Sequence, residues 1–579
     1  MRPVARLLLS LAGISFGVTL LSGCASMSPQ GVGASELTVA ERAPPAPVLP
    51  NVELSTGILN ELLVAEVALQ RAQYAAAVQL YARLTQQTRD PRIAERATRI
   101  AIFAREYPVG LELAKIWQEL SPADAEGQQI LTALLIKAND YDAAVTSLEP
   151  VLEQAQGDEQ NRYQLMIRLL SREQDKEGAL EVIQRFMVRH PEDPAGLYAH
   201  SQLALRAGKL DESEKAVDRL LQLRPELTQA MILRSRVLYG AGRQAEAVEY
   251  IGQMVKRNGD DMELRVAYGR MLVDLDRPEE AQAQFKRVLK AQPDNDDITF
   301  AAALVALRLE QPKDAETYFL RLNRKGVRAE ETGYYLGRIE EVRGNFKGAI
   351  QWYDKIDRGE NYLNGQIRSA LLQARLGDVD AARARLGAVQ ARVPEQSHRL
   401  YLAEGEILRD IERYDDAVKI YDHALQDLPD NTELLYARAM VAEKLGRIDW
   451  LERDLLAILE LEPDNVDALN SIGYTLADRT NRFDEAENYI KRALELKPDS
   501  FYILDSMGWL QYRRGNLPGA LDYLRRAITL SNDVEVVAHL GEVLWVSGDR
   551  EEARATWKRG LEQFPDNKML QGVIKRLDP

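Results

Sequence analysis

The sequence contains very little of the cysteine and histidine that disulfides and metal sites require. Only one of its 579 residues is a cysteine, Cys24, and five are histidines. After Cys24 the chain can therefore form neither an internal disulfide nor a thiolate metal site. No two histidines have the four-residue spacing of a helical metal pair, so we expect no metal site. We interpret each histidine as a surface or packing residue: His190, His200, His398, His423 and His539.

Motifs of the common enzyme classes are also missing. There is no glycine-rich phosphate loop after a strand and no G-x-S-x-G elbow. Acidic pairs such as Asp415 with Asp416 lie at expected helix starts, where carboxylates interact favourably with the helix dipole. A glycan-processing enzyme would need a catalytic constellation that the sequence does not offer. We therefore expect no catalytic residues and no cofactor.

Positive charge is in deficit. The chain has 74 basic and 89 acidic side chains, which gives a formal net charge of −15. Residues 1–23 carry only the two positive charges of Arg2 and Arg6, so the rest of the chain is more acidic still. An acidic body repels the phosphate backbone and anionic lipid head groups. Nucleic acid is therefore not expected as a partner.

The first residues have the composition of a cleaved signal. Arg2 and Arg6 precede an apolar run from Leu7 to Leu21, which is too short to cross a bilayer comfortably as a helix of about 20 residues. The following stretch, "LSGC", resembles the lipobox of bacterial lipoproteins. This resemblance implies that residues 1–23 are a lipoprotein signal peptide and that Cys24 is lipidated. The alternative is an ordinary secretory signal with an incidental cysteine.

The residue after Cys24 indicates which membrane would carry such a lipoprotein. Residue 25 is alanine, not the aspartate that commonly retains such lipoproteins in the inner membrane. The resemblance therefore implies an outer-membrane lipoprotein that faces the periplasm of a Gram-negative bacterium. Residues 24–55 are rich in proline, alanine, glycine and serine, and we expect them to form the lipidated cysteine and a flexible tether.

Beyond residue 55 the chain repeats itself. The pattern is helical, and alanines recur at intervals of 34 residues, as at Ala247, Ala281, Ala315 and Ala349. Residues of defined type recur at fixed distances from this alanine. A small residue lies twelve positions before it, including Gly269, Gly337, Gly405, Ala439, Gly508 and Gly541. A bulky side chain lies four positions after it, including Phe285, Phe319, Tyr353, Tyr421, Leu524 and Trp557. Proline often lies twelve positions after it, as at Pro293, Pro429, Pro463, Pro498 and Pro565.

This pattern resembles the tetratricopeptide repeat (TPR), a helix-turn-helix unit that stacks into a superhelical solenoid. The resemblance implies an all-α fold of about fifteen repeats. We expect irregular TPR-like repeats over residues 56–190, a regular array over 191–566 and a capping helix over 567–579. The small residues would let paired helices approach closely, while the bulky side chains fill the gap beside them.

Two neighbouring repeats share a further pattern, "LNSIGYTL" from Leu469 and "LDSMGWLQ" from Leu504. Packing explains the glycines and the apolar residues of these stretches. The remaining side chains have spacings of four and seven, which place them on one side of the first helix of each repeat, away from its buried stripe. They are Asn470, Tyr474, Asp505, Trp509 and Tyr512, with Tyr334, Arg338 and Tyr436 as similar positions further back.

In the TPR family this side of the first helix lines the concave surface, where partner peptides or domains usually bind. Aromatic side chains beside amide or carboxyl groups suit such contacts, because they offer rigid area and hydrogen bonds at low entropic cost. The alternative is that Tyr474 and Trp509 only pack between adjacent repeats.

The whole arrangement resembles the TPR lipoproteins that act as adaptors for periplasmic carboxyl-terminal processing proteases. The resemblance implies a non-enzymatic scaffold that binds and activates such a protease and presents substrates such as peptidoglycan cross-link hydrolases. It covers the lipobox, the tether and the repeats. An alternative is a scaffold of an exopolysaccharide export or outer-membrane assembly complex.

Overall fold

The computed structural model describes residues 50, 52–154, 162, 165–167, 170 and 175–578. The expected signal peptide (1–23), Cys24 and nearly all of the expected tether lie outside the described residues. Among the residues described, no helix is both long and apolar enough to cross a membrane.

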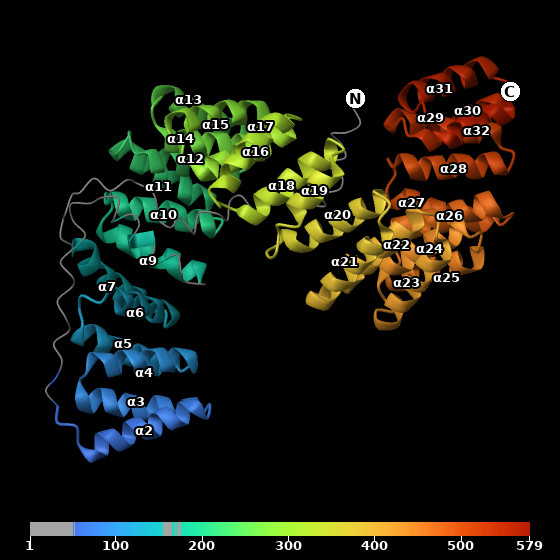
Figure 1. Ribbon diagram of the computed structural model, residues 1–579. Coiled ribbons are helices and arrows are strands. Elements are labelled where there is room, and N and C mark those ends of the chain that lie inside the picture. The colour runs from blue at the N-terminus through green and yellow to red at the C-terminus, as the bar shows by residue number, and fades with distance from the viewer. Residues whose placement is uncertain are drawn as a thin grey trace. The chain divides into compact units, whose positions relative to one another are not determined.

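Helices and short connections make up the described chain, and no strand occurs in it (Figure 1). Paired helices contact each other, as α26 with α27 and α28 with α29 do, and the first helix of one hairpin also contacts the first helix of the next, as α26, α28 and α30 do. The fold is therefore an all-α array of helical hairpins, about 30 helices in all, which confirms the predicted class.

The chain divides into two compact units at Tyr318 and Phe319, within α17, and each unit is described by itself. The helices of the first unit are α2 (Thr56–Gln70), α3 (Tyr74–Thr88), α4 (Pro91–Phe103), α5 (Tyr107–Leu120), α6 (Ala125–Lys137), α7 (Tyr141–Gln154), α9 (Lys176–Arg189), α10 (Pro194–Arg206), α11 (Leu210–Leu223), α12 (Thr228–Gly240), α13 (Gln244–Arg257), α14 (Met262–Asp274), α15 (Pro278–Ala291), α16 (Asp296–Arg308) and the start of α17 (Pro312–Arg324).

The second unit continues the same hairpin order. Its helices are α18 (Ala329–Val342), α19 (Phe346–Tyr353), α20 (Asn361–Arg375), α21 (Val379–Arg392), α22 (Ser397–Asp410), α23 (Tyr414–Asp427), α24 (Thr432–Lys444), α25 (Ile448–Leu461), α26 (Val466–Arg479), α27 (Phe483–Leu496), α28 (Phe501–Arg513), α29 (Leu517–Leu530), α30 (Val534–Ser547), α31 (Arg550–Gln563) and α32 (Lys568–Leu577), with a short 3-10 turn at Pro394–Gln396.

Many of the first helices begin at a side-chain cap that the sequence supplies. In the repeated Pro-Asp-Asn stretches, the asparagine is the residue before the helix, and its side chain accepts a hydrogen bond from a first-turn amide. Asn431 accepts from Leu434 N at 3.0 Å, and Asn465 accepts from Ala468 N at 2.9 Å. Such caps satisfy amides that the helix itself cannot pair.

The contact between the small residue and the bulky side chain of each repeat is confirmed. A Cβ atom built on Gly269 would come within 2.5 Å of the Phe285 ring, and one on Gly405 would overlap the Tyr421 ring. The second helix therefore places its aromatic ring directly against the backbone of the first. The turn between the two helices needs a residue with positive φ, which is often glycine, as at Gly344 (φ 76°) and Gly548 (φ 99°), although Asp276 (φ 56°) and Glu412 (φ 61°) hold the same position in other repeats.

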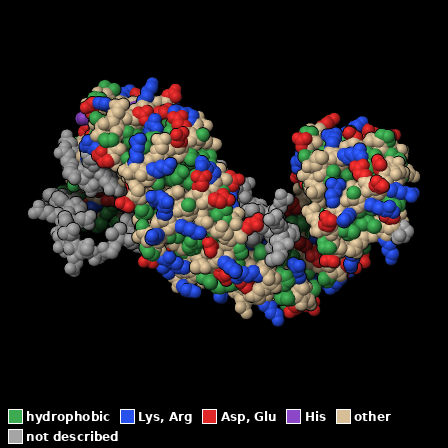
Figure 2. All heavy atoms as spheres, turned by 90° about the horizontal axis from the view of Figure 1, so that it is seen from above, with side chains coloured by type: hydrophobic (Ala, Val, Ile, Leu, Met, Phe, Trp, Pro, Cys, Tyr) green, Lys and Arg blue, Asp and Glu red, His purple; other side chains and the backbone are tan. Residues whose placement is uncertain are grey.

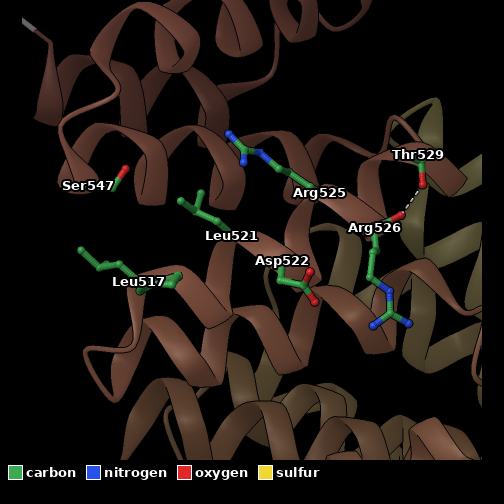
Figure 3. Close-up of a pocket in the computed structure, with 8 residues that line it drawn as sticks. Leu517, Leu521, Asp522, Arg525, Arg526, Thr529 and Ser547 are labelled. Carbon is green, nitrogen blue, oxygen red and sulfur yellow. Dashed lines mark hydrogen bonds between the residues drawn. The ribbon is translucent and has the colours of Figure 1, made fainter.

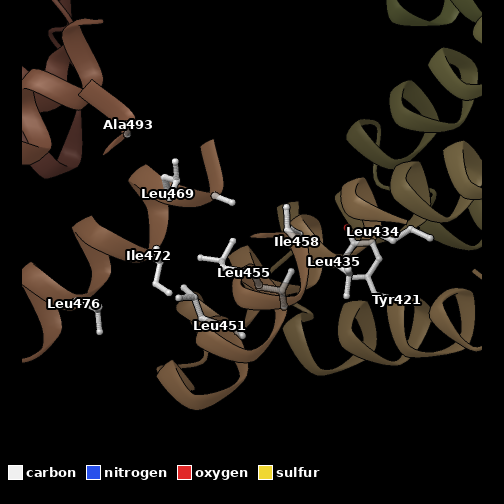
Figure 4. Packing of buried hydrophobic residues seen from close by; sticks show 14 of the residues in the cluster. Tyr421, Leu434, Leu435, Leu451, Leu455, Ile458, Leu469, Ile472, Leu476 and Ala493 are labelled. Carbon is white, nitrogen blue, oxygen red and sulfur yellow. The ribbon is translucent and has the colours of Figure 1, made fainter. Parts of the chain in front are cut away.

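Stacked hairpins share continuous apolar cores. In the second unit, Leu455 and Ile458 of α25 and Leu469 and Ile472 of α26 belong to one buried cluster that extends from α22 to α28 (Figure 4). The core is thus shared between repeats, so each repeat depends on its neighbours for burial.

One repeat departs from the pattern. Helix α19 has 8 residues, whereas α25 and α27 have 14 each. The chain then turns through residues 354–360, with Gly359 at φ 79°. The hairpin at α19 is therefore shorter than its neighbours, although Ala349 and Tyr353 keep the expected spacing and are fully buried.

Helix α32 covers the end of the array, as predicted. Its Leu570 is completely buried, while Val573, Ile574 and Leu577 are half-buried in a cluster with side chains of α30. Arg554 and Asp578 add an ion pair of 2.5 Å across the same end.

We expect Gly405→Ala to destabilise the protein by about 1 to 3 kcal/mol, because the added methyl group overlaps the Tyr421 ring in a close-packed core. The matched control is Gly387→Ala on α21, where an added Cβ meets nothing within 4 Å. That change should stabilise by roughly 0.5 to 1 kcal/mol through helix propensity. Thermal unfolding of both variants checks this. Equal stability of the two would contradict the close contact.

Candidate functional site

Polar and aromatic side chains connect the first helices of the last repeats. We call this set the helix ladder. It consists of hydrogen bonds and ring contacts among α24, α26, α28, α30 and the capping helix α32. Its members are Tyr436, Ser471, Tyr474, Asp478, Asp505, Trp509, Tyr512, Arg513, Glu535, His539, Glu542 and Arg576.

The centre of the helix ladder is a buried pair between α28 and α30. His539 Nδ1 lies 2.9 Å from Asp505 Oδ2 and 3.1 Å from Oδ1. The two residues are only 7% and 5% exposed. Taken alone, burial would lower the pKa of His539, but the carboxylates of Asp505, Glu535 and Glu542 outweigh it, so the pKa is raised. The protonated form of His539 is therefore favoured beside Asp505 relative to a free imidazole.

The ring of Trp509 packs against the His539 side of this pair. Its ring stacks on the imidazole with centroids 4.0 Å apart and planes at 20°, and its Nε1 donates to Asp478 Oδ1 of α26 at 2.9 Å. Arg513 donates to the same carboxylate at 3.4 Å. Because Trp509 is 9% exposed and has contacts in both neighbouring repeats, packing between repeats describes it well.

Tyr474 connects its own helix, α26, to α30, the first helix two repeats further along the chain. Its hydroxyl donates to Glu535 Oε1 of α30 at 3.3 Å, and its ring centroid lies 6.2 Å from that of His539. Burial, followed by the nearby negative charges of Glu535, Asp478 and Asp505, raises the pKa of the Tyr474 hydroxyl. Tyr474 is half-buried, so part of its ring faces solvent on the first-helix side.

The end of the helix ladder joins the capping helix. The Tyr512 hydroxyl donates to Glu542 Oε1 at 3.2 Å, and Arg576 of α32 donates to Glu542 Oε2 at 2.5 Å. Tyr512 also lies against Trp509, with ring centroids 5.0 Å apart. Glu542 is only 7% exposed, and its ion pair with the largely exposed Arg576 compensates its charge.

The other predicted residues have different surroundings. The hydroxyls of Tyr436 and Ser471 lie 2.9 Å apart, which joins α24 to α26. Asn470 is half-buried, and its Oδ1 is a buried acceptor without a hydrogen-bond partner in the described part of the chain. Arg338 donates to Tyr334 at 3.5 Å within α18, apart from the helices that carry the other candidates.

Sequence reasoning placed five of these side chains on one side of the first helices but did not find what they bond to. It missed Asp478, Glu535, Glu542 and Arg576, and it treated His539 only as a surface or packing residue. One signal in the sequence could have identified this pair. Asp505 and His539 occupy equivalent positions of neighbouring repeats, 34 positions apart.

A shallow hollow lies on a different side of the last repeats, beside the second helix α29 (Figure 3). It has a volume of about 850 Å³ and contains Leu517, Leu521 and Arg525. Arg525 is already paired with Glu552 at 2.8 Å. Within the described ranges, no three histidine, cysteine, aspartate or glutamate side chains are grouped so that they could hold a metal ion.

We expect Trp509→Ala to lower stability by about 3 to 5 kcal/mol, as for other buried aromatic truncations. Trp509→Phe keeps a ring beside His539 and loses mainly the hydrogen bond to Asp478, which is worth about 1.5 kcal/mol or somewhat more because the acceptor is charged. Denaturant unfolding of the two variants measures both losses of stability. If Trp509→Ala were as stable as the wild type, the ring would not be part of the packed ladder.

Solved structures with a similar arrangement include yeast Tom70, which is 18% identical, covers 73% of this chain and 96% of its own, and has a TM-score of 0.39. Another is a tetratricopeptide repeat protein from Parabacteroides merdae, which is 16% identical, covers 44% of this chain and 97% of its own, and has a TM-score of 0.35.

Comparisons of the sequence with family models and with a relative identify the family. Family models described as tetratricopeptide repeat match residues 113–330, 367–432, 402–449, 436–501, 475–535 and 534–559. The unmatched residues 331–366 contain the short helix α19. The TPR repeat-containing protein PA4667 of Pseudomonas aeruginosa is 34% identical over 528 residues, which cover 90% of this chain and 88% of that protein. The chain belongs to the tetratricopeptide-repeat family.

Proposed function

We propose that the protein is a non-catalytic scaffold at the outer membrane that binds and activates a periplasmic carboxyl-terminal processing protease and presents substrates such as peptidoglycan cross-link hydrolases. The observation that carries this proposal is the array itself, whose stacked first helices offer a series of side chains to a protein partner. Membership of the TPR family supports protein binding, and the narrower role rests on the resemblance to the adaptor lipoproteins.

The face proposed to bind is formed by the first helices α24, α26, α28 and α30. Tyr474 and Tyr512 are half-buried there, and each hydroxyl is bonded to a glutamate of α30. Their rings are thus held in place before a partner arrives, which lowers the entropic cost of binding. The buried Trp509 and His539 lie beneath them and act as support.

The rest of the surface fits a protein partner better than a polyanion. Acidic and basic side chains are interspersed over the face seen in Figure 2. In the described chain, acidic and basic side chains also pair across repeats, as Arg482 does with Glu452 and Arg492 with Asp464. This arrangement offers no extended basic surface on that face for a phosphate backbone.

The lipobox at Cys24 supports the proposed location. Each acyl CH₂ that enters the bilayer contributes roughly 0.8 kcal/mol, so a multiply acylated Cys24 would hold the protein durably. Fixing protease and substrate to one tethered scaffold raises their effective concentration without any new chemistry.

Reconstitution tests the proposal. Purified processing protease should degrade a cross-link hydrolase several-fold faster when this protein is added. Tyr474→Ala combined with Tyr512→Ala should remove most of this gain, while helical content stays unchanged. The matched control is Tyr489→Ala on α27, a half-buried tyrosine of a second helix. Equal degradation with and without the protein would refute the adaptor role.

A further inference from the structure

The strongest remaining feature is a charged pair inside the packed end of the array. His539 and Asp505 are both more than nine-tenths buried and belong to different repeats. Their 2.9 Å contact joins the last repeat to the one before it. Buried ion pairs of this kind are costly to break, because the partner that remains is left as an unpaired charge in a desolvated site.

The charged and titratable groups around His539 come from several helices. Asp505 belongs to α28 and the Tyr474 hydroxyl to α26, while Glu535 and Glu542 lie on α30 itself, and Arg576 of α32 bonds to Glu542. In the described part of the chain, no side chain of α29 or α31 forms a hydrogen bond or ion pair with His539. The surroundings of the imidazole are therefore predominantly negative, with Arg576 one contact away.

We propose that the His539–Asp505 pair is a pH-sensitive latch that holds the last repeat and the capping helix α32 closed while His539 is protonated. When the proton leaves, the imidazole no longer offers a positive charge to the carboxyl groups of Asp505, Glu535 and Glu542. The attraction between α28 and α30 is then reduced to a neutral hydrogen bond, and the end of the array opens more often.

The direction follows from proton linkage. The pKa of His539 is raised in the folded state above its ordinary value of 6.5. The folded protein therefore binds more protons than the unfolded chain in the interval above 6.5. The stabilising effect is complete below that value and is lost as the pH rises through the folded pKa. Each unit by which the pKa is raised corresponds to about a tenfold change in the opening equilibrium.

Opening of α30 would also affect the face proposed for partner binding, since Tyr474 and Tyr512 bond to Glu535 and Glu542 of this helix. This consequence rests on the proposed function. The latch itself does not, because it can be measured on the protein alone.

Hydrogen exchange of the full-length protein, measured between about pH 6 and about pH 9 and corrected for intrinsic exchange rates, tests the latch. We expect protection of α30 and α32 to fall roughly tenfold or more across this range, while helices of the first unit change little. His539→Gln should show the weaker protection at every pH and lose the pH dependence. The matched control is His423→Gln, at an exposed histidine of α23, which should keep it.

A second variant keeps the test decisive if His539→Gln loosens the fold generally. Asp505→Asn retains a hydrogen-bonding partner but removes the charge, so the pH-dependent fall should move to lower pH, with a smaller amplitude. Protection of α30 and α32 that stays constant across the range in the wild type would overturn the proposal. So would a fall of the same size in His539→Gln.

Discussion

The structure depends on one contact that recurs in its hairpins, in which a bulky side chain of the second helix fills the space left by a small residue of the first. At Gly405 and Gly541 the rings of Tyr421 and Trp557 occupy the place where a Cβ atom would be. This contact fixes the distance between paired helices. The first helices of neighbouring repeats also contact each other, so their polar side chains meet across repeats.

These contacts between first helices explain why the last repeats carry so many buried polar groups. Asp505, His539 and Glu542 would each be costly to bury alone, but each has a partner on another helix. Glu535 and Glu542 in turn accept hydrogen bonds from the half-buried Tyr474 and Tyr512. Stability and the proposed binding face thus arise from the same set of bonds, while the buried rings of Trp509 and Trp557 contribute to packing.

Much of the fold could be predicted because its determinants are close in sequence. Gly405 and Tyr421 belong to one repeat, so spacing alone identifies their contact. The shortness of α19 was not predictable in this way, since Ala349 and Tyr353 obey the pattern and only the turn after them departs from it. The sequence left open whether Trp509 packs between repeats or faces a partner, and the near-complete burial of Asp505 was missed, both for another reason. Helical spacing places a side chain on a face, but only the neighbouring repeat decides whether that face is covered.

A photo-crosslinking amino acid at position 474 tests whether the first-helix face of α24 to α30 contacts the proposed protease partner at the outer membrane. Position 456 on α25, where Leu456 is 40% exposed, is the comparison. We expect adducts with a carboxyl-terminal processing protease from position 474 only, in the outer-membrane fraction, and their release from that fraction by Cys24→Ser. Adducts from position 456 alone, or adducts from position 474 with export or assembly components and no protease, would contradict the proposed contact.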